Sequence, residues 1–368
     1  MESIVTGRIA GLEMLEIGPC KDSYEMGFLI GQRFSRQINS RLAKDLILRN
    51  QLLPFAHSPH SHSLLKSLSE NNMRRYPNYW MSSKELLKVA VFRFSSTAVM
   101  EVDVLQIMLL NFRKEILPFI PKAEESSSID TNDDCSDILV VSDSMAVAAH
   151  NEDANIALVG HTYLIKGNLP NGSSFTAYTY AGELPSCAFG FNSHGLAFTL
   201  NSVPPSKHEI DAGAIGRNFI CRDLLEAQSI DDALTRIQSS EASVGHSYNL
   251  IDTKTRRILN VETASRNRCS VHEVGPEPFF HANMYLHLGE NDENSLSRQK
   301  RAVVLPKASR KDFLLLLGDR NDSKYPIYMG GPLLYTLCTV VVNLDEKTLS
   351  IIEGDPKETQ PSFVFSMS

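Results

Sequence analysis

One cysteine stands where a thiol could act as a nucleophile. Cys135 follows the acidic pair Asp133-Asp134 and precedes an apolar, β-branched run at 138–141. It is therefore expected to be the first residue of a strand after a polar loop, a position that suits a thiol exposed by cutting the chain. We predict that the protein cleaves its own Asp134–Cys135 peptide bond and that Cys135 becomes an N-terminal nucleophile. The simpler alternative is a cysteine at a strand start with no chemical role.

The chemistry of such a residue follows from two ordinary pKa values. The thiolate is the reactive form of cysteine, and an isolated thiol has a pKa of about 8.5. A free α-amino group titrates at about 7.7–8.0, so an N-terminal cysteine carries its own base. Before cleavage that nitrogen is an amide and cannot serve. The same thiol can attack the Asp134 carbonyl to form a thioester that water hydrolyses, with Asp133 and Asp134 as candidate helpers.

Three polar clusters downstream could complete the site. In 150–153, Asp153 could orient the new amino group, although a plain β-turn is the commoner use of Asn and Asp. In 190–201, Asn192 fits an Asx-type hairpin turn that leads into a strand ending at Asn201. In 280–283, the Asn283 amide could donate to the oxyanion of a tetrahedral intermediate. Losing one such donor typically costs about 10²–10³ in rate.

The elements before Cys135 are expected to be mainly helical. Apolar residues recur every four positions from Met26 to Leu46, which predicts a long helix capped by Asp22 or Ser23. Further helices are predicted at 63–75, 82–95 and 102–114. A short strand or strand pair is predicted within 7–20, and a loop over 51–63.

After Cys135 the pattern changes to short strands. The run at 138–149 predicts a hairpin that turns at 142–144. Further strands are predicted at 156–166, 173–180, 186–191, 195–202, 247–252, 257–264 and 268–273, with helices over 216–238 and 295–318 and a final hairpin over 338–353. Within 216–238, the segment 229–232 resembles a capping box that restarts the helical pattern at Ser229. Tight turns between strands indicate antiparallel sheets, and the helices fall in blocks, so the predicted class is a layered α+β architecture.

The composition excludes several classes of protein. The 368 residues are 42% hydrophobic and 21% charged, which is ordinary for a globular chain that buries a sizeable core. The formal net charge of -7 provides no basic footprint for nucleic acid. No run has the length of a membrane span, and no secretory signal is evident. Six dispersed cysteines without CxxC argue against a disulfide scaffold or a zinc ribbon. We expect a cytoplasmic protein without nucleic-acid or membrane partners.

The histidines suggest two other kinds of site, a metal site and a Cys–His catalytic pair. His57, His60 and His62 have a spacing that could bind a metal, but the segment contains Pro and Ser and no carboxylate. A solvated loop is the preferred interpretation, and no metal site is predicted. A Cys–His hydrolase that pairs Cys135 with His150 or His281 remains an alternative, because triads are defined by geometry rather than by order along the chain.

A basic run occupies 297–301. We interpret it as the face of a helix, in which Arg298 could hold an anionic group of the substrate.

Taken together and in this order, the segments resemble the acyl-coenzyme A:isopenicillin N (6-aminopenicillanic acid) acyltransferase family of N-terminal nucleophile hydrolases. The resemblance covers nearly the whole chain. The matching segments are 23–27, 76–79, 102–111, Cys135, Asn151-x-Asp153, Gly182, 190–201, His281-x-Asn283, 297–301 and Tyr325-Pro326.

The resemblance implies an α+β fold, a four-layer αββα sandwich of two antiparallel sheets between helical layers. It implies self-cleavage into a mainly helical α chain, 1–134, and a catalytic β chain, 135–368. By the same resemblance Cys135 is the nucleophile, Asp153 orients its amine and Asn283 is the oxyanion donor, with Asn201 as a further candidate. No metal or organic cofactor is implied.

Two positions depart from the family pattern. Asp134 stands where glycine is frequent before the nucleophile. The stretch 325–336 contains no arginine, whereas penicillin acyltransferase has a Ser-Arg pair there. The second departure argues against penicillin-type substrates and leaves the thiol chemistry unchanged.

The sequence therefore predicts a self-processing cysteine amidohydrolase. Its expected substrate is a small N-acyl amine or N-acyl amino acid, such as a β-alanyl amide, which is cleaved through a thioester on Cys135 with water as acceptor. The alternative among enzymes is an N-acyltransferase that uses acyl-coenzyme A as a partner. A different class is an uncleaved relative that binds a ligand without catalysis.

Overall fold

The computed structural model describes residues 11–92, 99–121, 135–185, 188–203, 209–289 and 293–368. Its strands form two sheets, in which every pairing is antiparallel except that of β1 with β4. The larger sheet has the strand order β1 (Glu13–Ile17), β4 (Thr162–Asn168), β5 (Ser174–Tyr180), β6 (Gly190–Asn192), β7 (Leu196–Ser202), β8 (His246–Asp252), β9 (Arg257–Ala264), β10 (Arg268–Glu273). The smaller sheet has the order β11 (Phe279–His281), β2 (Ser136–Val141), β3 (Ala146–Asn155), β12 (Leu334–Asn343), β13 (Thr348–Ile352), β14 (Phe363–Ser366).

Helices precede, interrupt and follow these strands. The described α-helices are α1 (Ser23–Lys44), α2 (Leu53–Ala56), α3 (His62–Arg75), α4 (Pro77–Phe92), α5 (Val99–Asn111), α6 (Arg113–Ile116), α7 (Arg217–Leu224), α8 (Ile230–Gln238), α9 (Glu293–Val304) and α10 (Arg310–Leu317). A π-helical turn covers Leu48–Leu52, and 3₁₀ turns cover Pro59–Ser61, Leu117–Phe119 and Ile156–Leu158.

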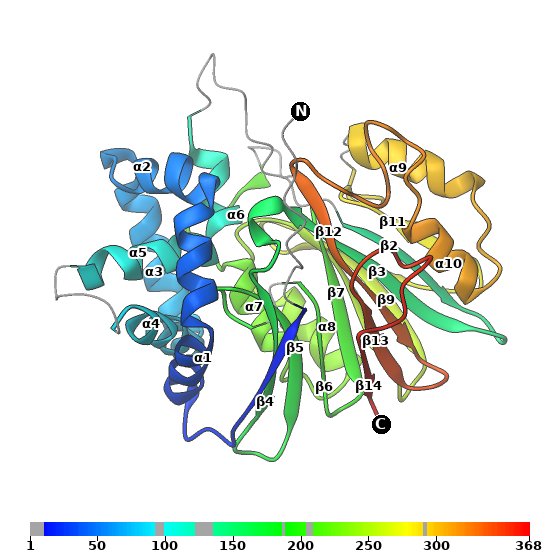
Figure 1. Ribbon diagram of the computed structural model, residues 1–368, viewed down its shortest axis with the longest axis horizontal. Coiled ribbons are helices and arrows are strands. Elements are labelled where there is room, and N and C mark those ends of the chain that lie inside the picture. Colours follow the sequence, from blue (N-terminus) through cyan, green and yellow to red (C-terminus); the bar gives the residue numbers. More distant parts are fainter. Residues whose placement is uncertain (1–10, 93–98, 122–134, 186–187, 204–208, 290–292) are drawn as a thin grey trace.

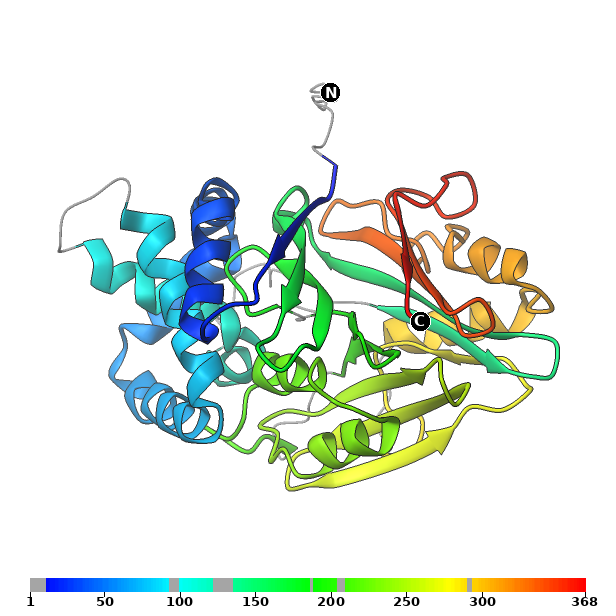
Figure 2. The same ribbon diagram turned by 90° about the horizontal axis from the view of Figure 1, so that it is seen from below.

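Three apolar cores separate four layers of structure. The first core joins the N-terminal helices, α7 and α8 to one face of the larger sheet. The second fills the space between the two sheets, and the third joins the smaller sheet to α9 and α10. Figures 1 and 2 show α1 to α5 at one side of the sheets and α9 and α10 at the opposite side. The predicted four-layer αββα sandwich is therefore confirmed.

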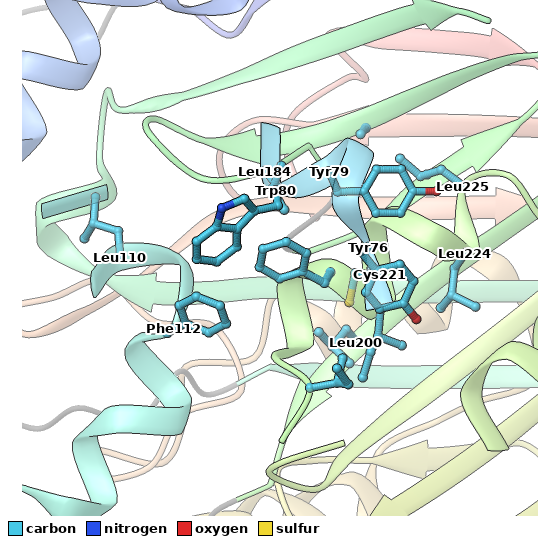
Figure 3. Close-up of a cluster of buried hydrophobic side chains, with 14 of the residues drawn as sticks. Tyr76, Tyr79, Trp80, Leu110, Phe112, Leu184, Leu200, Cys221, Leu224 and Leu225 are labelled. Carbon is cyan, nitrogen blue, oxygen red and sulfur yellow. The ribbon is translucent and has the colours of Figure 1, made fainter. Parts of the chain in front are cut away.

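Aromatic rings concentrate where the first helical layer meets the larger sheet (Figure 3). The ring of Phe219 from α7 lies 5.4 Å from that of Phe112 and 6.1 Å from that of Trp80, measured between centroids. Tyr76 and Tyr79 pack at the edge of the same group with centroids 5.6 Å apart. Buried aromatic pairs add stabilisation beyond the area that they bury, so this cluster ties α4 and α6 to α7.

The long N-terminal helix follows from local sequence signals. Asp22 caps α1 by accepting a hydrogen bond of 2.9 Å from the Glu25 N–H, as predicted. Gly27 lets α1 approach α4 closely, because a Cβ at that position would lie 2.2 Å from the Ser82 carbonyl oxygen.

Several predicted boundaries are wrong, each for a local reason. The segment 51–63 is helical rather than a loop, because Pro54 and Pro59 occupy first-turn positions where a missing N–H costs nothing. The helical stretch predicted over 216–238 is two separate helices, and the predicted cap at Ser229 is confirmed, since its Oγ accepts from the Asp232 N–H at the start of the second. The helix over 295–318 is also two, with a break at Pro306 and a new cap at Ser309.

Two strand boundaries also differ from the prediction. The strand expected from 156 begins at Thr162, because 156–158 form a 3₁₀ turn, and the last strand, β14, was not predicted. The predictions for 7–10, 93–95 and 186–187 lie outside the described residues, and the rest of the strand predicted at 186–191 begins only at Gly190. No described helix combines the length and the apolar character that crossing a bilayer demands.

Candidate active site

Cys135 lies directly before β2 and between the two sheets. Its side chain is 2% exposed. The β2–β3 pairing begins with Ser136 opposite Asn151, so Cys135 lies one residue beyond it, on the side of β3 where Glu152 follows Asn151. The thiol accordingly lies 4.0 Å from Glu152 Oε2 and 3.9 Å from the carbonyl oxygen of Asp153. Asp134 lies outside the described residues, so the structure does not test the predicted cleavage bond.

His150 lies beside this thiol between two carboxylates. Its Nδ1 is 3.0 Å from Asp137 Oδ1, and its Nε2 is 3.0 Å from Glu152 Oε2. All three side chains are buried. Burial alone would lower the pKa of His150, but the Asp137 carboxylate and the hydrogen bonds around the ring raise that pKa well above its usual value. The ring is therefore an imidazolium at neutral pH.

The same environment holds the Cys135 thiol in its neutral form. Burial, followed by the negative charge of Glu152, raises the pKa of Cys135 to about 12, and contact with His150 offsets only part of this. The continuous chain thus contains a protonated thiol next to an imidazolium that has no lone pair to offer.

A polar network connects this cluster to the larger sheet. The Tyr180 hydroxyl on β5 donates to Glu152 Oε1. Thr199 on β7 donates to Asp137 Oδ1 over 2.8 Å and accepts a hydrogen bond of 2.9 Å from Asn249 on β8. Because these contacts cross between the sheets, they fix the Cys135 end of β2 against β5 and β7.

Arg298 of α9 connects Cys135 with Asn283. The guanidinium is fully buried and donates to the Cys135 carbonyl oxygen over 2.7 Å, to Ser136 Oγ over 3.0 Å and to Asn283 Oδ1 over 3.0 Å. Since Asn283 Oδ1 accepts from Arg298, the amide nitrogen is the side of Asn283 available for donating. That nitrogen donates to the Ser202 carbonyl oxygen over 2.7 Å.

Glu262 of β9 secures the loop that carries Asn283. Its carboxylate is 3.3 Å from His281 Nε2 and accepts hydrogen bonds from the backbone N–H of His287 and Leu288 over 2.9 and 3.0 Å. The chain on both sides of Asn283 is therefore anchored to one buried carboxylate. Because His281 binds Glu262, its described contacts favour a supporting position over a pairing with Cys135.

The remaining candidates also lie at this end of the sheets. Asp153 faces α10 and β12, where Thr336 Oγ1 donates to its Oδ1. Asn201 is fully buried on β7, next to the residue that accepts from Asn283, and neither polar atom of its side chain has a partner among the described residues. An amide buried in this state is costly unless it meets a ligand.

The structure also tests the sequence interpretations of three short segments, 150–153, the turn at Asn192 and 297–301. The β-turn alternative for 150–153 is wrong, because these residues lie inside β3. The Asx-type turn at Asn192 is confirmed, since its Oδ1 accepts from the His194 N–H over 2.9 Å. The basic run 297–301 belongs to α9, as predicted, but Arg298 points inward while Arg301 pairs with Asp319 near the surface.

The sequence interpretation missed three members of the cluster: Asp137 and Glu152 in the smaller sheet, and Tyr180 in the larger one. It named His150 only as an alternative partner of Cys135. A usable signal existed for Asp137 and Glu152. The predicted hairpin at 142–144 pairs 137 with 150, and strand alternation puts 135, 137, 150 and 152 on one face.

The described residues contain one group of three or more His, Cys, Asp or Glu side chains close enough to share a metal ion, and it is Cys135, His150 and Glu152. A separate cavity of about 490 Å³ opens at the other end of the larger sheet, lined by residues that include Arg75, Tyr76, Tyr79 and Asn168. Cys135 does not line that cavity.

Comparison with known proteins gives a family and several relatives. A family model described as acyl-coenzyme A:6-aminopenicillanic acid acyl-transferase matches residues 140–358, which begins after Cys135. A β-alanyl-dopamine/carcinine hydrolase from Drosophila melanogaster is 24% identical over 372 residues, covering 92% of this chain and 92% of the relative.

Two solved structures are more distant. A Caenorhabditis elegans orthologue of N-acylethanolamine-hydrolyzing acid amidase has 11% identity and a TM-score of 0.40, covering 57% of this chain and 93% of its own. A conjugated bile acid hydrolase from Clostridium perfringens has 13% identity and a TM-score of 0.37, covering 64% of this chain and 92% of its own.

Proposed function

The chain belongs to the acyl-coenzyme A:6-aminopenicillanic acid acyl-transferase family, and from this premise we propose that it is a cysteine amidohydrolase that activates itself by cutting the Asp134–Cys135 bond. One observation carries the proposal. Cys135 begins a strand in the gap between the sheets, where Arg298 ties its carbonyl oxygen to the Asn283 side chain. The nucleophile and an oxyanion donor are thus held by the same guanidinium.

The substrate class comes from the insect relative. That protein is a hydrolase of β-alanyl-dopamine and carcinine by name, and 24% identity extends over nearly all of both chains. We propose a small N-acyl amine or N-acyl amino acid, such as a β-alanyl amide, as the substrate of this chain.

Self-cleavage begins with attack of the Cys135 sulfur on the Asp134 carbonyl carbon. The C–S bond forms, the C–N bond breaks, and the proton of the thiol ends on the Cys135 nitrogen. Water then hydrolyses the thioester, leaving a carboxyl group on Asp134 and a free α-amine and thiol on Cys135. The products are the proposed α chain, 1–134, and β chain, 135–368.

Turnover uses the new α-amine as the base. His150 is protonated between Asp137 and Glu152, so it cannot take the thiol proton, whereas a free amine can. The amine accepts that proton while the sulfur attacks the substrate carbonyl, and it returns the proton to the departing amine. Water resolves the thioester by the same steps.

Three side chains serve this reaction. Asn283 donates its amide N–H to the oxyanion once that hydrogen turns from the Ser202 carbonyl oxygen, and the Asn201 amide, which has no partner among the described residues, supplies a second donor. Asp153, held by Thr336, accepts from the α-amine and orients it. Arg298 positions Asn283 and the first residue of the strand, and its buried contacts favour this over capture of a substrate anion.

Acyl transfer to an amine is the second candidate, because the family description names an acyl-transferase. It shares every step as far as the thioester and differs only in the acceptor. Acyl-coenzyme A would then be the acyl donor. We further propose a cytoplasmic location, which fits the free thiols of Cys20, Cys135, Cys221, Cys269 and Cys338.

The decisive experiment is the intact mass of the purified wild type beside Cys135→Ala and the thiol control Cys269→Ser. Wild type and control are expected to give two fragments that divide at 134/135, and Cys135→Ala one uncut chain. A panel of β-alanyl and other N-acyl amines, with and without acyl-coenzyme A, then separates hydrolysis from transfer. An uncut wild type that still hydrolyses amides would remove the α-amine from the mechanism, and an uncut, inactive wild type would favour a ligand-binding relative.

A further inference from the structure

The mechanism above assigns no step to His150 or Glu152, two buried residues beside Cys135. A ring nitrogen of His150, a carboxylate oxygen of Glu152 and the Cys135 sulfur all lie within 4.8 Å of one another. Thiolate, imidazole and carboxylate are the ligand types that zinc selects in proteins. All three side chains are almost completely buried, so the group is not a chance gathering of surface acids.

The spacing of the donor atoms is close to that of a zinc site. Zinc bonds of about 2.0–2.3 Å in a tetrahedral arrangement separate the ligand atoms by about 3.4–3.7 Å. Here the sulfur lies 4.0 Å from Glu152 Oε2, and His150 Nε2 lies 3.0 Å from the same oxygen. The sulfur and the ring nitrogen lie within 4.8 Å of each other, so side-chain shifts of at most about 1 Å complete the geometry.

The outer contacts are those that a metal-binding histidine and carboxylate use. His150 Nδ1 faces Asp137 Oδ1 at 3.0 Å, the carboxylate–histidine arrangement that fixes which ring nitrogen binds a metal. Tyr180 donates to the second oxygen of Glu152, and Thr199 donates to Asp137. The side chains of His150 and Glu152 are therefore already held in orientation by Asp137 and Tyr180.

We propose that Cys135, His150 and Glu152 bind a zinc ion that holds the nucleophile inactive. Binding releases two protons to solvent, one from the thiol and one from the imidazolium nitrogen that faces Glu152, while the other ring nitrogen keeps its proton toward Asp137. The two positive charges of the cation replace those two protons, so the net charge of this buried cluster is unchanged. Cleavage of the Asp134–Cys135 bond would add the α-amine as a fourth donor.

The inhibition, unlike the binding itself, rests on the function proposed above for Cys135. A sulfur bound to zinc is a weaker nucleophile, because the cation withdraws electron density from it and fixes its position, and an α-amine bound to the same ion cannot act as a base. Removal of the metal by a chelator restores both groups. The protein would therefore work only where free zinc is scarce.

The test is a titration of metal-stripped, full-length protein with zinc against a competing chromophoric chelator. Wild type is expected to bind one zinc ion. Glu152→Gln, which keeps the shape of the side chain, and Cys135→Ser are expected to bind at least about 100-fold more weakly. Asp137→Asn removes only an outer contact and is expected to weaken binding about 10–100-fold.

Two controls remove rival sites. His57, His60 and His62 are exposed, and their combined replacement by alanine is expected to leave the affinity unchanged. Cys269→Ser removes a half-buried thiol on β10 and is expected to behave like wild type. Circular dichroism establishes that each variant is folded before it is titrated.

A second readout does not depend on activity. Cobalt(II) in place of zinc is expected to give a sulfur-to-metal charge-transfer band in the near ultraviolet, absent in Cys135→Ser and present in Cys269→Ser. Zinc affinity unchanged in both Cys135→Ser and Glu152→Gln, or folded wild type that binds no zinc, would overturn the proposal. Zinc binding by a protein that hydrolyses no amide would leave the site standing and refute the proposed function instead.

Discussion

The layer between the two sheets changes from apolar to polar side chains within two residues along each strand. At one end, the facing side chains are apolar and pack as one core, among them Ile251 of β8 and Ile258 of β9, which pair directly. Two residues along the same strands, the paired side chains are Asn249 and Asn260. The smaller sheet makes the same change, from Leu139 and Ala148 to Asp137 and His150.

The two ends also differ in how completely their polar groups are paired. The apolar end has nothing to pair and gains free energy from the area that it removes from water. The polar end keeps Asn260 Oδ1, Asp137 Oδ2 and both amide atoms of Asn201 without partners among the described residues. Each such group costs about 1–3 kcal/mol. We infer that the apolar end stabilises the sandwich and that the polar end is kept for chemistry at a cost in stability.

The largest effect is expected from truncating the apolar end. Ile258→Ala removes a fully buried side chain and should lower the free energy of unfolding by about 2–5 kcal/mol, with hydrolysis per folded molecule nearly unchanged. Urea unfolding in a Cys135→Ala background, which should keep the chain whole, measures the loss. Ile258→Val is the matched control, at about 0.5–1.5 kcal/mol. A strong loss of hydrolysis per folded molecule would mean that the two ends are not separable.

The opposite outcome is expected for Asn283, at the polar end. Asn283→Ala should reduce the rate of amide hydrolysis by about 10²–10³. Its stability should change far less, because Arg298 retains its contacts with the Cys135 carbonyl and Ser136. Steady-state kinetics beside urea unfolding separate the two effects. A variant that unfolds easily but keeps its rate would assign Asn283 a purely structural position.

A pH-dependent effect is expected at Glu262. Burial alone would raise the pKa of this carboxyl, but hydrogen bonds from His281 and the backbone N–H groups of Leu286 and His287 hold the pKa below its usual 4.5. Because the folded pKa is lowered, the stabilisation is complete above 4.5 and is lost as the pH falls through the folded value.

Glu262→Gln should therefore cost about 1–3 kcal/mol of unfolding free energy at pH 7 and progressively less below pH 4.5. Urea unfolding at a series of pH values measures the difference from wild type. A constant difference at every pH would show that the ionised form contributes nothing. The loop that carries Asn283 would then be held equally well by an uncharged side chain of the same shape at position 262.

The smallest change in stability is expected when the apolar end is extended. The double variant Asn249→Leu/Asn260→Leu removes both partners of a 2.8 Å hydrogen bond and an unpaired oxygen, so the free energy of unfolding should change by only about 1 kcal/mol in either direction. Hydrolysis should fall, because Thr199 loses the donor that orients it and its contact with Asp137 then fixes the Cys135 end of β2 against β7 less firmly. A loss of several kcal/mol would contradict the inference that the polar end costs stability, because the polar side chains would then stabilise the fold.

Local signals in the sequence were sufficient for much of the fold. The four-residue recurrence from Met26, with its cap at Asp22, predicted α1, and the hairpin turn at 142–144 predicted β2 and β3. Local signals failed where proline and serine redirect a helix, at Pro54, Pro306 and Ser309. The sequence does not distinguish a proline in the first turn of a helix from a proline that separates two helices. The difference depends on whether the residues before and after the proline are themselves helical.

The candidate site divides in the same way. Within β2 and β3, strand alternation and the hairpin register determine that Cys135, Asp137, His150 and Glu152 share one face, and these follow from the chain order alone. Contacts between elements far apart in the chain do not. The approach of Arg298 to Cys135 spans 163 residues, and that of Tyr180 to Glu152 joins two different sheets.

The sequence by itself determined the layered class, the strand that begins after Cys135 and the family to which the chain belongs. Only the tertiary structure decided that His150 lies between two carboxylates, that Arg298 points inward from a basic helix and that the Asn201 amide is buried with no partner in the described part of the chain. The physical reason is that periodicity is a property of neighbouring residues. Charge compensation and hydrogen-bond satisfaction depend instead on which distant strands and helices the packing brings together.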